Sequence, residues 1–141
     1  MTRVRIPAGA VMISKDYCIL QIIKKEVDSD KDTYELFFEG VPIGFSEIEI
    51  INLSEPHIRI FNHIIERQKR RGFGKILYYF IESLAKKKGF RYIIADCVEI
   101  NDKDAIGFWK AMSFRELTRE EAHSYKIALP DKDDTVYIKY L

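Results

Sequence analysis

The chain has 141 residues, of which 47% are hydrophobic and 32% are charged, and its formal net charge is +1. This length and composition predict one globular domain over residues 1–141 with a hydrophobic core. A net charge this close to zero excludes a global basic field that would recruit nucleic acid. No apolar run approaches the roughly 20 residues of a membrane span, and the N-terminus lacks the apolar segment of a secretory signal. We therefore expect a cytoplasmic protein that does not contact membranes.

The cysteines and histidines do not form a metal-binding pattern. Cys18 and Cys97 both lie inside apolar, strand-like runs, which is typical of buried small hydrophobic side chains and not of a disulfide or metal framework. None of the three histidines stands at metal-ligand spacing from a cysteine or another histidine. We expect no metal site.

Runs rich in β-branched and aromatic residues recur along the chain and predict strands. These runs cover residues 10–13, 17–25, 33–39, 41–51, 58–65, 91–98, 114–117 and 135–141. The run at 17–25 would also suit a short helix. Gly40 separates two of the runs and predicts a β-hairpin, while the polar run at 28–32 predicts a turn or loop.

The first predicted helix follows the strand-like run at 58–65. Apolar residues recur at helical spacing from Ile76 to Ala85, the helix is expected to run to Lys88, and Gly89 stands where a left-handed C-terminal cap is expected. A strand–helix–strand unit over 58–98 implies parallel pairing of its two strands, whereas the hairpin is antiparallel. The predicted fold class is α/β (α+β), with a mixed, mostly antiparallel sheet and helices on its faces.

Two further helices are predicted in the C-terminal part of the chain. Asn101 is the expected N-cap of the second helix, with Asp104 at its third helical position. The segment Thr118-Arg-Glu-Glu121 has the pattern of a capping box and predicts a short third helix.

A basic, glycine-containing segment at 69–75 connects the strand at 58–65 to the first helix. The free N–H groups of a first helical turn and about half a positive charge from the helix dipole favour an anion there, most often a phosphate. Gly72 and Gly74 lack Cβ atoms and would let a ligand approach the backbone. The same turn is also consistent with a tight connection beside a solvated basic surface.

Two stretches resemble the GNAT superfamily of acetyl-CoA-dependent N-acetyltransferases. Lys69-Arg-Arg-Gly72-Phe-Gly74, between a strand and a helix, is similar to the family's Gln/Arg-x-x-Gly-x-Gly/Ala motif. Ala105-Ile-Gly-Phe-Trp-Lys-Ala-Met-Ser-Phe114 is similar to its Ala-x-x-aromatic-aromatic-x-x-x-Gly-Phe helix. The resemblance covers roughly residues 33–117. It implies a GNAT-like fold in which the strands on either side of the first helix splay apart, acetyl-CoA as co-substrate, and an amine of a small molecule or protein as acceptor.

The resemblance also implies which residues bind acetyl-CoA. The residues expected at its phosphates are Lys69, Arg70, Arg71, Gly72, Phe73, Gly74 and Lys75. The backbone of Asn62 and Ile64 would pair with the pantetheine arm and polarise the thioester carbonyl. The residues that would line or hydrogen-bond the pantetheine are Asn101, Asp102, Phe108 and Trp109.

Four residues depart from the family's pattern. Lys69 replaces the usual Gln or Arg and still suits phosphate. Ser113 replaces a glycine, which a serine tolerates if its φ is not positive. Trp109 stands where many members have a tyrosine that protonates the leaving thiolate. Ile58 stands where the histone-acetylating branch places its glutamate base, so histone-type specificity is not supported.

The general base and the acceptor pocket are therefore less well defined than the cofactor site. Glu99, just after a predicted strand, is the first candidate base, with a solvated loop carboxylate as the alternative. His63 is the second, with a hydrogen-bonded structural histidine as the alternative. The segment before Thr33 is short for the two helices that usually form the acceptor side, so that pocket is either reduced or built differently, for example across a homodimer.

Three functions stay open from the sequence. The first is an N-acetyltransferase, and the second is a non-catalytic acyl-CoA-binding or regulatory module of the same fold, motivated by the absent tyrosine and glutamate. The third is a nucleic-acid-binding domain that uses the basic cluster at 67–71, against which the near-zero net charge argues.

Overall fold

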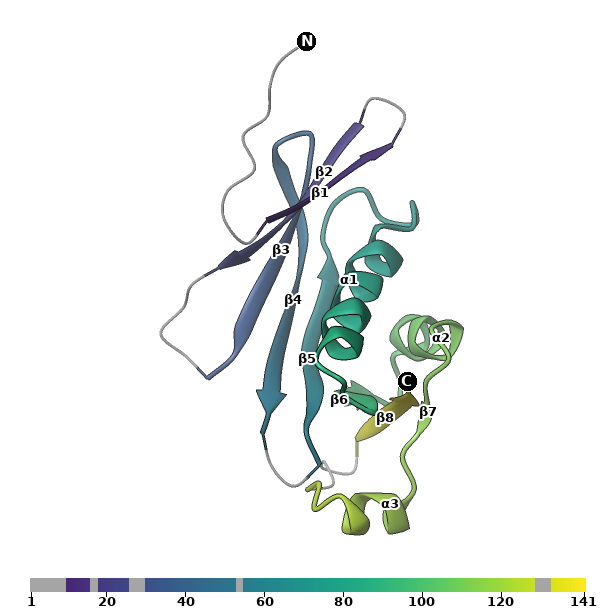
Figure 1. The fold of residues 1–141 in the computed structure, drawn as a ribbon. Helices are drawn as coiled ribbons and strands as arrows, with labels where there is room; N and C mark the ends of the chain where they lie inside the picture. Colours follow the sequence, from purple (N-terminus) through teal and green to yellow (C-terminus); the bar gives the residue numbers. More distant parts are fainter. Residues whose placement is uncertain (1–9, 16–17, 26–29, 53–54, 129–132) are drawn as a thin grey trace. The chain divides into compact units, whose positions relative to one another are not determined.

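The computed structural model describes residues 10–15, 18–25, 30–52, 55–128 and 133–141 (Figure 1). The strands in these segments are β1 (Ala10–Lys15), β2 (Cys18–Lys25), β3 (Asp32–Phe38), β4 (Val41–Ile51), β5 (His57–Ile65), β6 (Tyr92–Glu99), β7 (Arg115–Glu116) and β8 (Asp134–Tyr140). The helices are α1 (Phe73–Lys87), α2 (Lys103–Ala111) and α3 (Arg119–Ser124). Residues 28 and 29 of the predicted polar loop, and the side chains of Cys18 and Cys97, lie outside what the structure describes.

The strands form one mixed sheet in the order β1-β2-β3-β4-β5-β6-β8-β7. Strands β1 to β4 pair antiparallel, as do β6 with β8 and β7 with β8. The parallel pair is β5 with β6, where Ile58–Ile60 lies beside Ile93–Ala95. The prediction of a mixed, mostly antiparallel sheet with one parallel strand pair is confirmed.

The chain divides into two compact units. Unit 1 comprises Met1–Ile48 and Asn62–Phe80, and unit 2 comprises Glu49–Phe61 and Ile81–Leu141. Strands β4 and β5 and helix α1 therefore each contribute residues to both units. None of the helices in the described segments is long and apolar enough to span a membrane.

In unit 1, the predicted hairpin of β3 and β4 turns at Glu39 and Gly40, whose φ angles are 50° and 80°. Two consecutive residues with positive φ make a type I′ turn, which matches the twist of the flanking strands. Tyr34 and Leu36 are buried, and the Tyr34 ring packs edge-on against Phe80 of α1 at 5.2 Å. Helix α1 thus covers the face of the sheet that these two residues share.

A bulge in β4 forms hydrogen bonds with the chain that follows β5. Leu36 pairs with Gly44 and Phe37 pairs with Pro42, which leaves Ile43 as the extra residue. The Ile43 carbonyl accepts hydrogen bonds from the backbone N–H groups of Glu66 at 2.7 Å and Arg67 at 3.1 Å. The bulge therefore fixes the direction in which the chain leaves β5.

In unit 2, helices lie on both faces of the sheet. Lys139 of β8 forms an ion pair with Glu82 of α1. Tyr92 and Ile138 point to the other face, where they share a buried cluster with Ala122 of α3. Because side chains alternate between the faces of a strand, α1 and α3 are on opposite sides. This confirms the prediction of helices on both faces.

The helix ends in unit 2 follow local sequence signals. Gly89 has a φ of 75°, its N–H bonds the Lys86 carbonyl at 3.0 Å, and the Phe90 N–H bonds the Ala85 carbonyl at 3.0 Å. These are the two bonds of a Schellman motif, so the predicted left-handed cap is confirmed. Helix α1 ends one residue before the predicted Lys88.

The predicted position of the N-cap of α2 was wrong by one residue. Asp102, not Asn101, caps the helix, and its Oδ1 accepts a hydrogen bond from the Ala105 N–H at 3.0 Å. Either side chain can cap a helix, and the sequence did not fix which residue the preceding turn would place there. Asp104 is consequently at the second helical position and still lies in the first turn.

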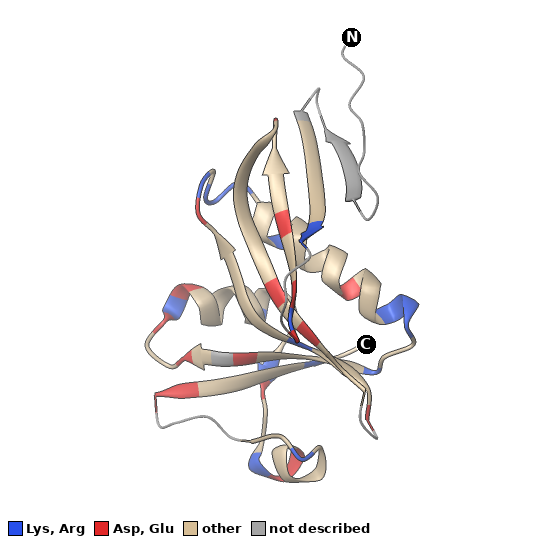
Figure 2. Cartoon of the chain, turned by 90° about the vertical axis from the view of Figure 1, so that its left-hand side faces the viewer, with Lys and Arg blue, Asp and Glu red and all other residues tan. Residues whose placement is uncertain are grey.

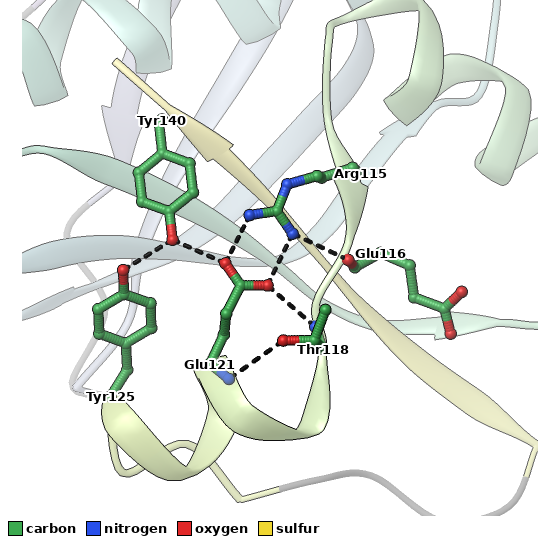
Figure 3. A network of polar contacts seen from close by, with 6 residues as sticks. All are labelled: Arg115, Glu116, Thr118, Glu121, Tyr125 and Tyr140. Carbon is green, nitrogen blue, oxygen red and sulfur yellow. Dashed lines mark hydrogen bonds and ion pairs between the residues drawn. The ribbon is translucent and has the colours of Figure 1, made fainter.

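The capping box of α3 is confirmed and forms part of a larger polar cluster (Figure 3). The Glu121 carboxylate accepts two hydrogen bonds from the Arg115 guanidinium, at 2.6 and 2.5 Å, and a third from the Thr118 N–H at 3.0 Å. The Tyr140 hydroxyl donates to Glu121 at 2.8 Å and accepts from Tyr125 at 2.7 Å. These donors lower the pKa of Glu121, chiefly through Arg115. Because Arg115 is on β7 and Tyr140 is on β8, the same hydrogen bonds attach α3 to both strands.

Candidate functional site

The segment between β5 and α1 has left-handed backbone at every second residue. Gln68, Arg70 and Gly72 have φ angles of 59°, 64° and 82°. Positive φ at alternate residues is typical of a concave anion-binding nest, in which successive N–H groups turn toward one side. Only Gly72 of the three adopts this conformation without steric cost, and a Cβ there would meet no atom within 4 Å. The backbone is open to a ligand at this residue.

The N-terminus of α1 directly continues this segment. The Ile76 N–H bonds the Gly72 carbonyl at 3.2 Å, so the N–H groups of Phe73, Gly74 and Lys75 are those without an acceptor inside the helix. The first turn carries no acidic residue. Helix dipole, nest and basic side chains thus all favour an anion, and Figure 2 shows the concentration of Lys and Arg between β5 and α1.

Arg71 differs from its basic neighbours because its side chain is held against the protein. Its guanidinium lies over the rings of Phe38 and Phe73, at 5.2 and 5.4 Å, and donates to Gln68 Oε1 at 2.7 Å. The two rings also contact each other at 5.1 Å. Arg71 therefore ties the segment to β3 although it is also exposed, and Lys69, Arg70 and Lys75 are exposed beside it.

His63 links β5 to both β4 and α1. Its Nε2 lies 2.7 Å from the Gly74 carbonyl, and its Nδ1 lies 3.1 Å from Ser46 Oγ. A carbonyl can only accept, so Nε2 carries the proton. Burial lowers the pKa of His63 to about 4 despite the opposing hydrogen bond to Gly74. A neutral imidazole with both nitrogens in polar contacts is what we expected of a hydrogen-bonded structural histidine. The role of His63 as a general base stays a prediction.

Asn62 and Ile64 lie on β5 next to His63, and both side chains are exposed. The Asn62 amide donates to Glu47 Oε1 at 2.9 Å. The backbone carbonyl of Asn62 lies 3.3 Å from Ser46 Oγ, so it shares the single hydroxyl proton of Ser46 with Nδ1 of His63. Neither Ser46 nor Glu47 was predicted from the sequence to be near the site. The sequence showed only that they are consecutive polar residues in a predicted strand, so their side chains point to opposite faces. Their contacts with Asn62 and His63 depend on β4 lying beside β5.

Unit 2 contains the other predicted site residues. Glu99 ends β6, is exposed, and pairs in register with Asp134 of β8. Asp102 is exposed but caps α2, and Asn101 is exposed beside it. These three residues belong to one turn, since the Asp102 N–H bonds the Glu99 carbonyl at 3.0 Å.

The two aromatic residues predicted to line a channel are on α2. Trp109 is 6% exposed and packs edge-on against Phe108 at 5.0 Å and Phe114 at 4.9 Å. Phe108 is half-buried. Trp109 is thus a core residue of unit 2, and only Phe108 of the pair presents a substantial exposed surface.

The structure therefore brings the predicted residues together in two groups. Unit 1 holds Asn62, His63, Ile64 and residues 69–75, and unit 2 holds Glu99, Asn101, Asp102, Phe108 and Trp109. Within the described segments, no group of three His, Cys, Asp or Glu side chains could hold a metal ion.

Residues 10–114 match the Acetyltransferase (GNAT) family, which is most of the chain. No curated protein matches it. Among solved structures, the PaiA N-acetyltransferase of Thermoplasma acidophilum, in complex with coenzyme A, is 19% identical with a TM-score of 0.62 and covers 77% of this chain. This chain spans 60% of that protein's length.

Two further solved structures have the same fold. An acetyltransferase of Bacillus subtilis, in complex with CoA, is 14% identical with a TM-score of 0.65, over 86% of this chain and 99% of its own. Naa50 of Arabidopsis thaliana, in complex with the bisubstrate analogue CoA-Ac-MVNAL, is 20% identical with a TM-score of 0.62, over 77% of this chain and 72% of its own.

Proposed function

Because the chain belongs to the GNAT acetyltransferase family, we propose that it transfers an acetyl group from acetyl-CoA to an amine of a small molecule or protein. The observation that carries this proposal is the backbone nest at Gln68, Arg70 and Gly72, followed directly by the N-terminus of α1. A diphosphate group is the anion that such a nest and helix end suit best. The names of the N-acetyltransferases with this fold support an amine as acceptor.

Acetyl-CoA would supply the activated acyl group, and the residues of unit 1 would bind and orient it. The N–H groups from Arg70 to Lys75 would bind the pyrophosphate, with Lys69, Arg70 and Lys75 neutralising its charge. Arg71 would act indirectly, by holding the segment in shape through Phe38 and Phe73. His63 would hold the first turn of α1 through the Gly74 carbonyl.

The transfer itself needs an uncharged amine and a donor for the thioester oxygen. The amine nitrogen forms a bond to the acetyl carbon, and the carbon–sulfur bond breaks with its electron pair leaving on CoA as a thiolate. The amine proton passes to a base. Backbone N–H groups at Asn62 and Ile64 are the proposed donors to the developing negative charge. Glu99, exposed at the end of β6, is the proposed base, directly or through water.

Calorimetric titration with acetyl-CoA tests the proposed cofactor site. Gly72→Glu adds a carboxylate to the nest and is expected to abolish saturable binding. Gly89→Glu is the matched control, because Gly89 also has positive φ, 75° against 82°, and a Cβ there also meets no atom within 4 Å. The control carries the same backbone strain without touching the nest, and we expect it to bind like the wild type.

Each outcome of this experiment has a defined meaning. Wild-type protein that does not bind millimolar acetyl-CoA, or equal effects of the two substitutions, would contradict the proposal. Saturable binding without thiol release from any amine in a panel would instead support a non-catalytic acyl-CoA-binding module.

A further inference from the structure

A cavity of about 370 Å³ lies within unit 1, on strands β2 to β4 and the chain just after β5. Its charged and hydroxyl side chains are Lys25, Glu35, Glu66, Arg67 and Thr33. Pro42, Phe45 and the backbone of Gly44 complete the lining. Two cations and two carboxylates therefore surround one small space with a partly apolar wall.

One of the two charge pairs is already satisfied. Lys25 Nζ lies 3.0 Å from Glu35 Oε1, and the Glu35 side chain is only 17% exposed. Glu66 and Arg67 are exposed and make no ion pair with the other described residues. The cavity consequently offers one carboxylate and one guanidinium to a ligand.

The backbone that carries this second pair is fixed in place. The N–H groups of Glu66 and Arg67 both bond the Ile43 carbonyl at the β4 bulge. Gly44, next to the bulge, is buried and packs directly against the backbone of Ile64 and Ile65. Two backbone bonds and this close packing hold the two charged residues at one rim of the cavity, so the site is largely preformed.

We infer that this cavity binds the acetyl acceptor, and that the acceptor is an amino-acid-like zwitterion with a free α-carboxylate. The planar guanidinium of Arg67 matches a carboxylate, and the Glu66 carboxylate matches the ammonium group. A dianionic ligand would be repelled by the Glu66 carboxylate, and a dicationic ligand would be repelled by the Arg67 guanidinium. A zwitterion pairs with both side chains. The inference rests on the proposed function, because it identifies the acceptor of that reaction.

The position of the pair just after β5 agrees with this role. Glu66 is two residues beyond Ile64, whose backbone is proposed to polarise the thioester, and two residues of chain span at most about 7 Å. An ammonium group held at Glu66 would therefore lie within a short side-chain movement of the reacting carbon. A protein N-terminus has no α-carboxylate, so Arg67 would select against it.

An acceptor screen with matched substrates tests the inference. The twenty common amino acids are each compared with their amides, which keep the amine and lose the carboxylate, by thiol release from acetyl-CoA. We expect at least one amino acid to be acetylated with a kcat/KM at least tenfold above that of its amide. Arg67→Gln should raise KM for that amino acid at least tenfold and raise KM for its amide by much less, and Arg67→Lys should restore part of the loss.

Arg119→Gln is the matched control, since Arg119 is an exposed arginine of α3 in unit 2, and it should change neither KM. Equal acetylation of acids and amides, or an unchanged KM in Arg67→Gln, would overturn the zwitterion site while leaving the acetyltransferase proposal intact. If no amine is acetylated, NMR chemical shifts of the backbone amides of Gly44, Glu66 and Arg67 are measured with the same amino acids and amino-acid amides. These shifts report whether the cavity binds an amino acid. Absence of amino-acid-specific shifts would overturn the inference, whereas loss of acetyl-CoA binding would contradict the proposed function separately.

Discussion

Ser113 adopts a backbone conformation that favours glycine. Its φ is 70°, and the N–H groups of Ser113 and Phe114 bond the carbonyls of Lys110 and Trp109 at 3.0 and 2.9 Å. These are the same bonds that Gly89 makes possible at the end of α1. The condition under which a serine was expected to be tolerated, a φ that is not positive, is thus not met, and the residue retains steric strain of about 1 kcal/mol.

Replacement of Ser113 by glycine is expected to stabilise the protein. Ser113→Gly removes the strain at the cost of a more flexible unfolded chain, so we expect the free energy of unfolding to rise by about 0.5–1 kcal/mol and Tm by about 2–4 °C. Ser113→Ala keeps the Cβ and should give no gain. Thermal and urea unfolding measure both variants; a stabilised alanine variant would show that the strain argument is wrong.

The β4 bulge shows how one small residue holds an element in place. A Cβ at Gly44 would lie 2.7 Å from Ile65 Cδ1 and 3.0 Å from Ile65 Cα, and closer still to the Ile64 carbonyl. Real Cβ atoms do not come this close to backbone, so Gly44→Ala must push β5 away. We expect a loss of about 2–3 kcal/mol in the free energy of unfolding.

Gly107 provides the matched control for this substitution. It lies in α2, and a Cβ there meets no atom within 4 Å. Gly107→Ala should stabilise the protein by up to about 1 kcal/mol, because alanine is the better helix former. Urea unfolding compares the two, and a Gly44→Ala variant as stable as the wild type would contradict the close approach of β5.

An ion pair joins β5 to β6 beside their parallel pairing. Arg59 contacts Asp96, with side chains 22% and 7% exposed, and the Arg59 Nε is buried without a hydrogen bond to the described residues. Removal of the carboxylate leaves that guanidinium partly buried and unpaired. Asp96→Ala should therefore cost about 3 kcal/mol of unfolding free energy.

A double-mutant cycle of Arg59→Met and Asp96→Ala measures the interaction itself. We expect a coupling free energy of about 2 kcal/mol. Lys24 and Asp32, 3.8 Å apart and 45% and 33% exposed, form the reference pair and should couple by less than about 0.5 kcal/mol. Similar couplings in the two cycles would mean that burial does not strengthen the Arg59–Asp96 pair.

Across the whole molecule, each unit contains a histidine that resists protonation. His63 in unit 1 has its pKa lowered to about 4 by burial. Burial also lowers the pKa of His57 in unit 2, where Nδ1 lies 2.8 Å from the Glu55 carbonyl and the buried Nε2 has no partner among the described residues. Below about pH 6.5 the unfolded chain binds protons at both positions that the folded chain does not.

The protein is therefore expected to lose stability as the pH falls from 7 to 5. The unfolded state binds more protons in this range, so the free energy of unfolding decreases, by about 2 kcal/mol at pH 5 from His63 alone. His63→Gln should flatten this dependence although it lowers stability at pH 7. His123→Gln, at an exposed position on α3, should leave the profile unchanged; a wild-type profile that is flat between pH 7 and 5 would contradict the lowered pKa values.

The sequence alone determined the features that depend on neighbouring residues. The hairpin at Gly40, the cap at Gly89 and the capping box from Thr118 to Glu121 are all local, because each forms bonds within a few residues. The motif at 69–75 belongs to the same class, since a turn and a helix N-terminus create an anion site without distant partners. Family and fold class followed from these elements and their order.

Tertiary structure decided what depends on residues distant in the chain. Strand pairing placed Ser46 beside Nδ1 of His63, and burial of the ring in the folded chain lowered the pKa of this histidine. It also placed Arg59 against Asp96 and brought the segment after β5 to a cavity on β2–β4. Sequence spacing carries no information on such contacts, because burial and the facing strand, not neighbouring residues, set the chemistry of each side chain.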